Sequence, residues 1–193
     1  ALLPRLGTLR HVAFQYCQYS SRYDKFKEGM VMNAFNPLLS NAALMDIGVY
    51  CVHPMVKLFG MPQKISADSI FLSNGMEGMG TVIADYGAMQ AVLVYSKIVN
   101  SYLPSQIEGE AGSMLIREIS EPKEIELYLR NGDHEVIKID KKGNNMYYEI
   151  MELLRLIENG EDGSIHNQYS LYEMEVMDEV RKCAGIDFSV KTL

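Results

Sequence analysis

Four polar side chains share one face of an otherwise apolar stretch, residues 41–59. They are Asp46, Tyr50, His53 and Lys57, and their spacing of four, three and four residues is that of neighbours along one side of a helix. A carboxylate, a phenol, an imidazole and an amine are groups that proteins use to take up or release a proton during a reaction. This stretch is therefore the first candidate for a functional site.

The stretch that carries these side chains is predicted to be a buried helix. Asn41 is a suitable N-cap and Gly60 a suitable end, and the residues between them are apolar on nearly all sides. Pro54 removes the amide that would bond to the carbonyl of Tyr50, so we expect a kink or an opened turn there. Two interpretations of Asp46 and Tyr50 stay open at this point: a reactive pair, or a hydrogen-bonded pair that only supports the helix.

The glycines of residues 75–80 do not form a dinucleotide-binding motif. Their order, G-x-x-G-x-G, is the reverse of G-x-G-x-x-G, and a predicted strand follows where a helix would have to begin. We expect a hairpin loop there. The sequence also has no P-loop, no H-E-x-x-H and no G-x-S-x-G motif.

The remaining histidines and the cysteines give no second site. The histidines lie far from one another and from any acidic cluster, so surface or strand positions are expected for His11, His134 and His166. The cysteines are odd in number and lack a C-x-x-C pair, which argues against both disulfides and a metal site. Reduced thiols are expected at Cys17, Cys51 and Cys183.

The composition is that of an acidic globular domain. Hydrophobic residues make up 48% and charged residues 22% of the 193 residues, and 18 Lys and Arg against 25 Asp and Glu leave a net charge of -7. Nucleic acids and anionic membranes attract clustered basic residues, so neither is an expected partner. No stretch approaches the ~20 apolar residues of a membrane span, and we expect a cytoplasmic protein.

The rest of the chain is predicted to form strands and two closing helices. Short connections favour antiparallel strands, and the candidates are residues 8–19, 64–72, 80–86, 90–96, 106–109, 113–116, 124–130 and 135–139. Residues 20–40 are expected to be irregular. Helices are predicted at 144–159 and 169–184, each with an apolar side for the core; the first places Tyr147, Ile150, Leu154 and Ile157 on one side. We predict an α+β fold in a single domain, residues 1–193, with a mainly antiparallel open-faced sheet of about six strands and helices packed on one face.

A sheet covered on one face only leaves its other face to be explained. Apolar or aromatic residues occur on both faces of the predicted strands: Ile70, Leu72, Val82, Ala84, Tyr86, Val92, Val94 and Tyr95. An exposed apolar face of that size usually marks an interface. We therefore expect a homodimer or higher oligomer formed through the open sheet face, or a partner domain docked there.

The stretch Leu44-Met45-Asp46-Ile47-Gly48-Val49-Tyr50 resembles the D-[IV]-G-x-Y signature of the glucose-fructose oxidoreductase/inositol dehydrogenase (Gfo/Idh/MocA) family. Further segments agree with that family in their order along the chain: residues 8–12, 20–23, 58–62, 80–82, 107–113, 148–150 and 170–172. The resemblance covers residues 7–188 and matches the C-terminal half of the family.

The resemblance implies an oxidoreductase that transfers hydride to or from a sugar, a polyol or a related cyclic alcohol. Family members carry an N-terminal Rossmann domain that binds NAD or NADP and supplies a catalytic lysine from an E-K-P motif. Neither feature is found in this sequence, so we expect the chain to be the substrate-binding and oligomerisation domain. Alone it is expected to be inactive and to bind no cofactor; its partners would be a small-molecule substrate and its own Rossmann domain.

The resemblance also implies roles for individual residues. Tyr50 occupies the acid/base position of the tyrosine-type members, and Asp46 that of the family aspartate beside the nicotinamide and the substrate. Arg22 falls in the loop near the cofactor, and His53, offset from the position used by histidine-type members, is expected to contact the substrate rather than to replace Tyr50. The alternative is a non-catalytic dimerisation or ligand-binding module in which Tyr50 and Asp46 are structural.

Two features qualify the implied chemistry. A phenol, with an ordinary pKa of about 10, becomes a useful base only beside a cation, and Lys57 is about two turns (~10 Å) along the helix from Tyr50. The family's usual G-G-G-A run before the signature is Ser40-Asn41-Ala42-Ala43 here. Side chains at those positions crowd the backbone that approaches the ligand, which bears on substrate preference.

Overall fold

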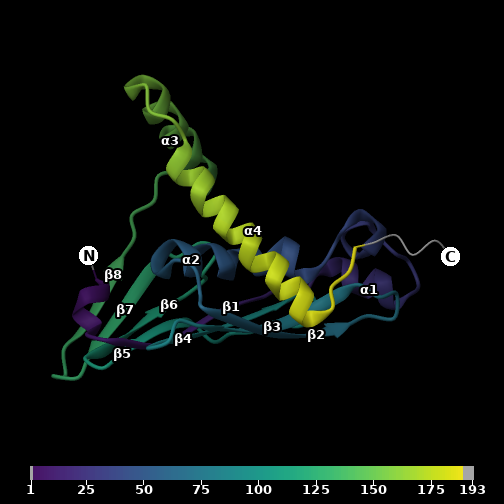
Figure 1. Cartoon of the computed structure of the whole chain (residues 1–193), viewed down its shortest axis with the longest axis horizontal. Coiled ribbons are helices and arrows are strands. Elements are labelled where there is room, and N and C mark those ends of the chain that lie inside the picture. Colours follow the sequence, from purple (N-terminus) through teal and green to yellow (C-terminus); the bar gives the residue numbers. More distant parts are fainter. Residues whose placement is uncertain (1, 189–193) are drawn as a thin grey trace.

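A computed structural model describes residues 2–188, and its centre is one eight-stranded sheet (Figure 1). The strand order is β2-β3-β4-β1-β5-β6-β7-β8, and every neighbouring pair is antiparallel except β1 and β4. The strands are β1 (Leu9–Cys17), β2 (Lys64–Phe71), β3 (Glu77–Asp85), β4 (Gln90–Ser96), β5 (Ser105–Gly109), β6 (Gly112–Ile116), β7 (Glu124–Leu129) and β8 (His134–Lys138).

The predicted α+β class and the mainly antiparallel sheet are confirmed, but the expected count of about six strands was too low. All eight candidate segments form strands, including the short, charge-rich β7 and β8 at one edge. Their charged residues alternate with apolar ones, and the tight turn at Asn131-Gly132 brings the two strands into register. Alternation and turn chemistry therefore outweigh the high charge of this region.

The helices are η1 (Leu3–Leu6), α1 (Ser21–Lys27), η2 (Asn33–Phe35), η3 (Pro37–Leu39), η4 (Leu44–Gly48), α2 (Val49–Phe59), α3 (Asn145–Asn159) and α4 (Ser164–Ala184). As predicted, helices cover one face of the sheet and leave the other open (Figure 1). Residues 20–40 are more ordered than expected, because the Ser20 side chain accepts a hydrogen bond from the amide of Arg22 and starts α1.

The core lies between the covered face of the sheet and helices α2 and α4. Alternate residues of β1, β3 and β4 point toward the helices, while the intervening residues, such as Ile83, Val92 and Val94, lie on the open face. The buried cluster includes Val12, Phe14, Val82, Ala84, Ala91, Leu93 and Tyr95 from the sheet, and Cys51, Val52, Met55, Val56, Val176, Met177 and Val180 from the helices. Three residues expected to contribute to an interface, Val82, Ala84 and Tyr95, are thus core residues.

The helix predicted over residues 41–59 begins with a widened π-turn, η4, and continues as α2. The helix runs through Pro54, so the irregular turn lies before Tyr50 and not between Tyr50 and Pro54 as expected. Two contacts hold this turn. A carboxylate oxygen of Glu77 accepts a hydrogen bond from the amide of Leu44 at 2.9 Å, and Gly48 packs so closely on the Tyr95 ring that a Cβ would lie 3.1 Å from it.

The last two helices leave the body of the molecule. The C-terminal part of α4 packs on β2 and α2, whereas α3 and the beginning of α4 stand clear of the sheet (Figure 1). Helix α4 begins at Ser164, five residues earlier than predicted. The apolar side of α3 was expected to face the core, but none of its residues is buried.

Candidate functional site

Asp46 and Tyr50 lie one helical turn apart where η4 passes into α2, and a lysine from the sheet completes the site. Lys97 directly follows β4, and its ammonium lies 2.6 Å from a carboxylate oxygen of Asp46. The same ammonium donates a hydrogen bond to the carbonyl of Ala34 at 2.8 Å and lies 5.1 Å from the centre of the Phe35 ring. Lys97 is only 3% exposed, whereas about half of the Asp46 side chain, 52%, is exposed.

This pair gives Asp46 a fixed orientation at the surface. A buried ammonium is tolerated only when it is charge-paired and hydrogen-bonded, and Lys97 meets both conditions through Asp46 and Ala34. The carboxylate is bound from the protein side and remains accessible from the solvent side. Such a group can accept a hydrogen bond from a bound hydroxyl without moving.

The phenol of Tyr50 is open to solvent. The residue is 45% exposed, and its ring packs edge-to-face on that of Tyr16, with the ring centres 5.2 Å apart. Within residues 2–188 no side chain or backbone group bonds to its hydroxyl. The ring is therefore positioned by packing while the hydroxyl is available to a ligand.

Asp46 lines one cavity, and a second cavity is lined by Tyr16, whose ring packs on that of Tyr50; Tyr50 itself lines neither. The first, of about 520 Å³, is bordered by Arg22 and Asn41 as well as by Asp46, so the structure brings Arg22 and Asp46 to the same space. The other, of about 450 Å³, lies between the end of β1 and residues 101–104 and 117–121, and Tyr16 is part of its wall. Its polar lining includes Gln15, Gln18, Ser101 and Arg117. Amides, hydroxyls and a guanidinium are groups that hydrogen-bond to a hydroxyl-rich ligand.

The other two residues of the polar stripe point to a different element. His53 Nδ1 lies 3.0 Å from a carboxylate oxygen of Glu173 on α4, and the Lys57 ammonium lies 5.9 Å from the centre of the Tyr169 ring. The four residues therefore divide into a solvent-facing pair, Asp46 and Tyr50, and a pair that joins α2 to α4.

Two residues of the site were not found from the sequence. Lys97 carried one signal, a lysine placed directly after an apolar strand. Glu77 lies in the glycine-rich stretch 75–80 that was expected to be a hairpin loop. The turn is instead at residues 73–75, where the Gly75 amide bonds to the Leu72 carbonyl, and β3 already begins at Glu77. Glu77 is 1% exposed, and burial raises the pKa of its carboxyl above the ordinary 4.5. Gly80 is needed because a Cβ there would overlap the Tyr95 hydroxyl.

The expected surface histidines each meet a single carboxylate: His11 pairs with Glu108, His134 with Glu126 and His166 with Glu152. All three cysteines are free, and burial raises the pKa of the Cys17 and Cys51 thiols, which keeps them protonated. Among the residues that the structure describes there is no cluster able to hold a metal ion and no helix long and apolar enough to cross a membrane.

Comparison of the sequence and the fold with known proteins shows which proteins the chain is similar to. The chain is 46% identical over 186 residues to the scyllo-inositol 2-dehydrogenase (NADP(+)) IolU of Bacillus subtilis, covering 95% of the chain and 57% of IolU. It is 36% identical to the uncharacterized oxidoreductase YgjR of Escherichia coli, covering 96% of the chain and 57% of YgjR. In fold it matches the aldose-aldose oxidoreductase of Caulobacter crescentus with a TM-score of 0.77 at 16% identity, over 95% of this chain and 56% of that one. No protein-family model matches the sequence.

The relatives are oxidoreductases of the Gfo/Idh/MocA type, and the chain matches their C-terminal, sheet-forming part. The chain spans little more than half the length of the curated relatives that it matches.

Proposed function

We propose that the chain is the substrate-binding domain of an NAD(P)-dependent dehydrogenase that acts on a hydroxyl group of a sugar, a polyol or a related cyclic alcohol. The observation that carries the proposal is the solvent-facing pair of Asp46, which is fixed by Lys97 and lines a polar cavity, and Tyr50, which is exposed one helical turn away. The names of the relatives support it, since IolU is a scyllo-inositol dehydrogenase that uses NADP(+).

Tyr50 is assigned the proton transfer. In the oxidation direction its phenol oxygen takes the proton of the substrate hydroxyl while hydride leaves the same carbon. Asp46 orients that hydroxyl, and Lys97 balances the negative charge of Asp46 so that a phenolate one turn away is less disfavoured. Arg22 and His53 are assigned to binding: Arg22 at the cavity that it shares with Asp46, and His53 through the part of its ring that stays exposed one turn beyond Tyr50 while Nδ1 pairs with Glu173.

The residues present fit one edge of a nicotinamide cofactor rather than the whole of it. The cavity beside Arg22 and Asp46 is open and polar, which suits a ring amide, but the described residues include no glycine-rich loop leading into a helix that could hold a pyrophosphate. When bound, the cofactor accepts or supplies the hydride. We assign its pyrophosphate to the Rossmann domain that the family resemblance implies.

The rival function, a non-catalytic binding or dimerisation module, has one observation in its favour: Asp46 is paired with a buried lysine, as a structural residue would be. A purely structural role does not explain why the side chain of Tyr50 is exposed to solvent. We also propose that residues 1–193 act as one domain that oligomerises through the open sheet face, in the reducing cytoplasm that its free cysteines suit.

The test is an assay of the full-length polypeptide with NADP(+) and NAD(+) against a panel of inositols, other polyols and aldoses. We expect formation of reduced nicotinamide with members of that panel, and none with the 193-residue chain by itself. Full-length protein that binds NADP(+) yet oxidises no cyclic or open-chain polyol or aldose would contradict the proposal.

A further inference from the structure

The hairpin formed by α3 and the first half of α4, residues 145–173, is called the arm below. One side of α3 is apolar and uncovered: its six side chains are between 39% and 66% exposed, and they are Met146, Tyr147, Ile150, Leu153, Leu154 and Ile157. Their spacing is that of one helix face, the face that a helix of a globular protein normally turns toward a core. Within residues 2–188, none of the side chains on this face is buried by another element.

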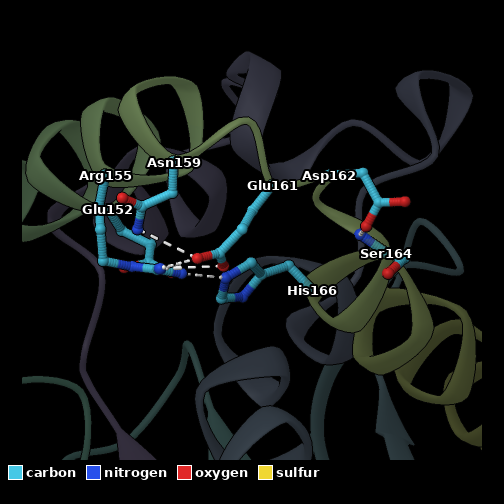
Figure 2. A network of polar contacts seen from close by, with 7 residues as sticks. All are labelled: Glu152, Arg155, Asn159, Glu161, Asp162, Ser164 and His166. Atoms are coloured by element: carbon cyan, nitrogen blue, oxygen red, sulfur yellow. Dashed lines mark hydrogen bonds and ion pairs between the residues drawn. The ribbon is translucent and has the colours of Figure 1, made fainter.

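The opposite, polar side of α3 makes the contacts within the arm (Figure 2). The Arg155 guanidinium lies 2.9 Å from both carboxylate oxygens of Glu161 and also pairs with Glu152, which in turn lies 3.0 Å from His166 in the first turn of α4. Exposed ion pairs of this kind contribute little stability. An isolated helix of 15 residues is marginal in water and depends on packing of its apolar face. The helix α3 therefore needs another domain or chain packed against its apolar face.

The inner side of α4 also continues past the sheet. Ile165, Tyr169, Tyr172 and Val176 follow one another at helical spacing; Val176 is buried in the core, whereas Ile165 is 54% exposed beyond it. The arm begins next to the candidate site, because Glu173 of α4 contacts His53, one turn from Tyr50. A domain packed against the arm would therefore lie beside Tyr50.

We propose that the arm is the docking surface for the nucleotide-binding domain of the same polypeptide. This inference rests on the proposed function. The match leaves more than two fifths of IolU outside it, which is enough chain for a second domain. A domain that brings a nicotinamide to Tyr50 and Asp46 must approach the helix-bearing face, where the arm stands (Figure 1). A second copy on the open sheet face would lie on the opposite side and leave the arm uncovered.

The test is hydrogen exchange of the α3 amides, residues 145–159, in the full-length polypeptide. A variant with Ile150→Gln and Leu154→Gln loses apolar contact area, and a control with Glu149→Gln and Glu158→Gln adds the same two glutamines off that face. We expect α3 to exchange at least about tenfold faster in the first variant and within about twofold of the parent in the control. Unchanged exchange in β3 and β4 checks that the core of each variant is folded.

Two results would overturn the docking surface: α3 exchanging as fast as the connecting residues 160–163 in the parent, or protection that disappears on dilution as oligomers dissociate, which would make a second copy the occupant. Calorimetry with NADP(+) on the same sample separates this inference from the proposed function. Protected α3 without NADP(+) binding leaves the surface standing and contradicts the function. Substrate turnover with unprotected α3 does the reverse.

Discussion

At the residue scale, Lys97 provides the cation beside Asp46 that the sequence of the helix itself does not offer. A phenol that is to act as a base needs a cation near it, and Lys57, on the same helix, instead lies over Tyr169. Lys97 reaches Asp46 from the end of β4 and is buried in doing so. On the proposed function, the cation that Tyr50 needs is therefore Lys97, which directly follows β4 and acts through Asp46.

Replacing Tyr50 by Phe in the full-length protein removes only a hydroxyl, since the ring that packs on Tyr16 remains. We expect kcat to fall by about 10²- to 10⁴-fold, the usual effect of losing an acid/base group, with little change in the KM of the substrate. Steady-state kinetics and a thermal melt on the same preparation check this. Near-full activity with a lower melting temperature would make Tyr50 structural.

Lys97→Met keeps the packing on Phe35 but removes the partner of Asp46 and of the Ala34 carbonyl. The buried carbonyl left unpaired should cost about 1–3 kcal/mol of unfolding free energy. If Lys97 positions Asp46 against the substrate hydroxyl, kcat should also fall, because the freed carboxylate no longer has a fixed orientation. Lys57→Met is the control. A loss of stability with an unchanged kcat would reduce Lys97 to a structural role.

At the scale of elements, local signals predicted most of the fold. The buried helix over residues 41–59, the hairpin before β3 and the antiparallel neighbours follow from caps, alternation and turn residues that act within a few positions. The parallel pairing of β1 with β4 could not be predicted in this way, because it joins residues as far apart in the sequence as His11 and Gln90. Lys97, the partner of Asp46, directly follows β4, so its place in the site could not be predicted locally either.

The division of the polar stripe was also beyond local reasoning. Helical spacing places Asp46, Tyr50, His53 and Lys57 on one face, but it does not say which of them α4 will cover. His53 meets Glu173 across 120 positions of sequence. Likewise, a glutamate in a glycine-rich loop is ordinarily solvated, and only the tertiary structure places Glu77 under the first turn of the helix.

At the scale of elements, the buried carboxyl of Glu77 holds the first turn of the helix, and its effect on stability can be tested. Burial raises the pKa of this carboxyl in the folded protein, so the folded state holds this proton more tightly than the unfolded chain. Its contribution to stability is complete below the unfolded value and is lost as the pH rises through the folded value. Glu77→Gln keeps an acceptor for the Leu44 amide and cannot ionise. We expect urea unfolding to show less loss of stability in this variant than in the parent from about pH 5 to 8.

The exposed Glu158→Gln is the control for that measurement and should follow the parent at each pH. A Glu77→Gln variant whose stability falls with pH as steeply as that of the parent would show that the buried carboxyl does not titrate differently on folding. The Leu44 amide would then be held by a group that is ionised throughout.

At the scale of the whole molecule, the sheet separates two surfaces with different tasks. The helix-bearing face carries the candidate site and the arm, and the open face carries a group of apolar side chains on β2, β3 and β4, toward one edge of the sheet; among them are Ile70, Ile83, Val92 and Val94. The strands at the other edge, β7 and β8, present charged residues on that same face, such as Glu126 and Lys138. An exposed apolar patch beside a charged region is typical of a protein interface.

The matching prediction is that the protein is at least a dimer through its open face, as light scattering at concentrations on the order of tens of micromolar would show. Ile83→Gln should weaken the dimer, because it places an amide among the apolar side chains of that face. Leu58→Gln is a matched control: Leu58 is 45% exposed and Ile83 44%, but Leu58 lies on α2, on the helix-bearing side. A monomeric parent would contradict the prediction outright. A dimer weakened equally by both substitutions would move the contact away from the open face, and the apolar side chains of β2, β3 and β4 on that face would then need another partner.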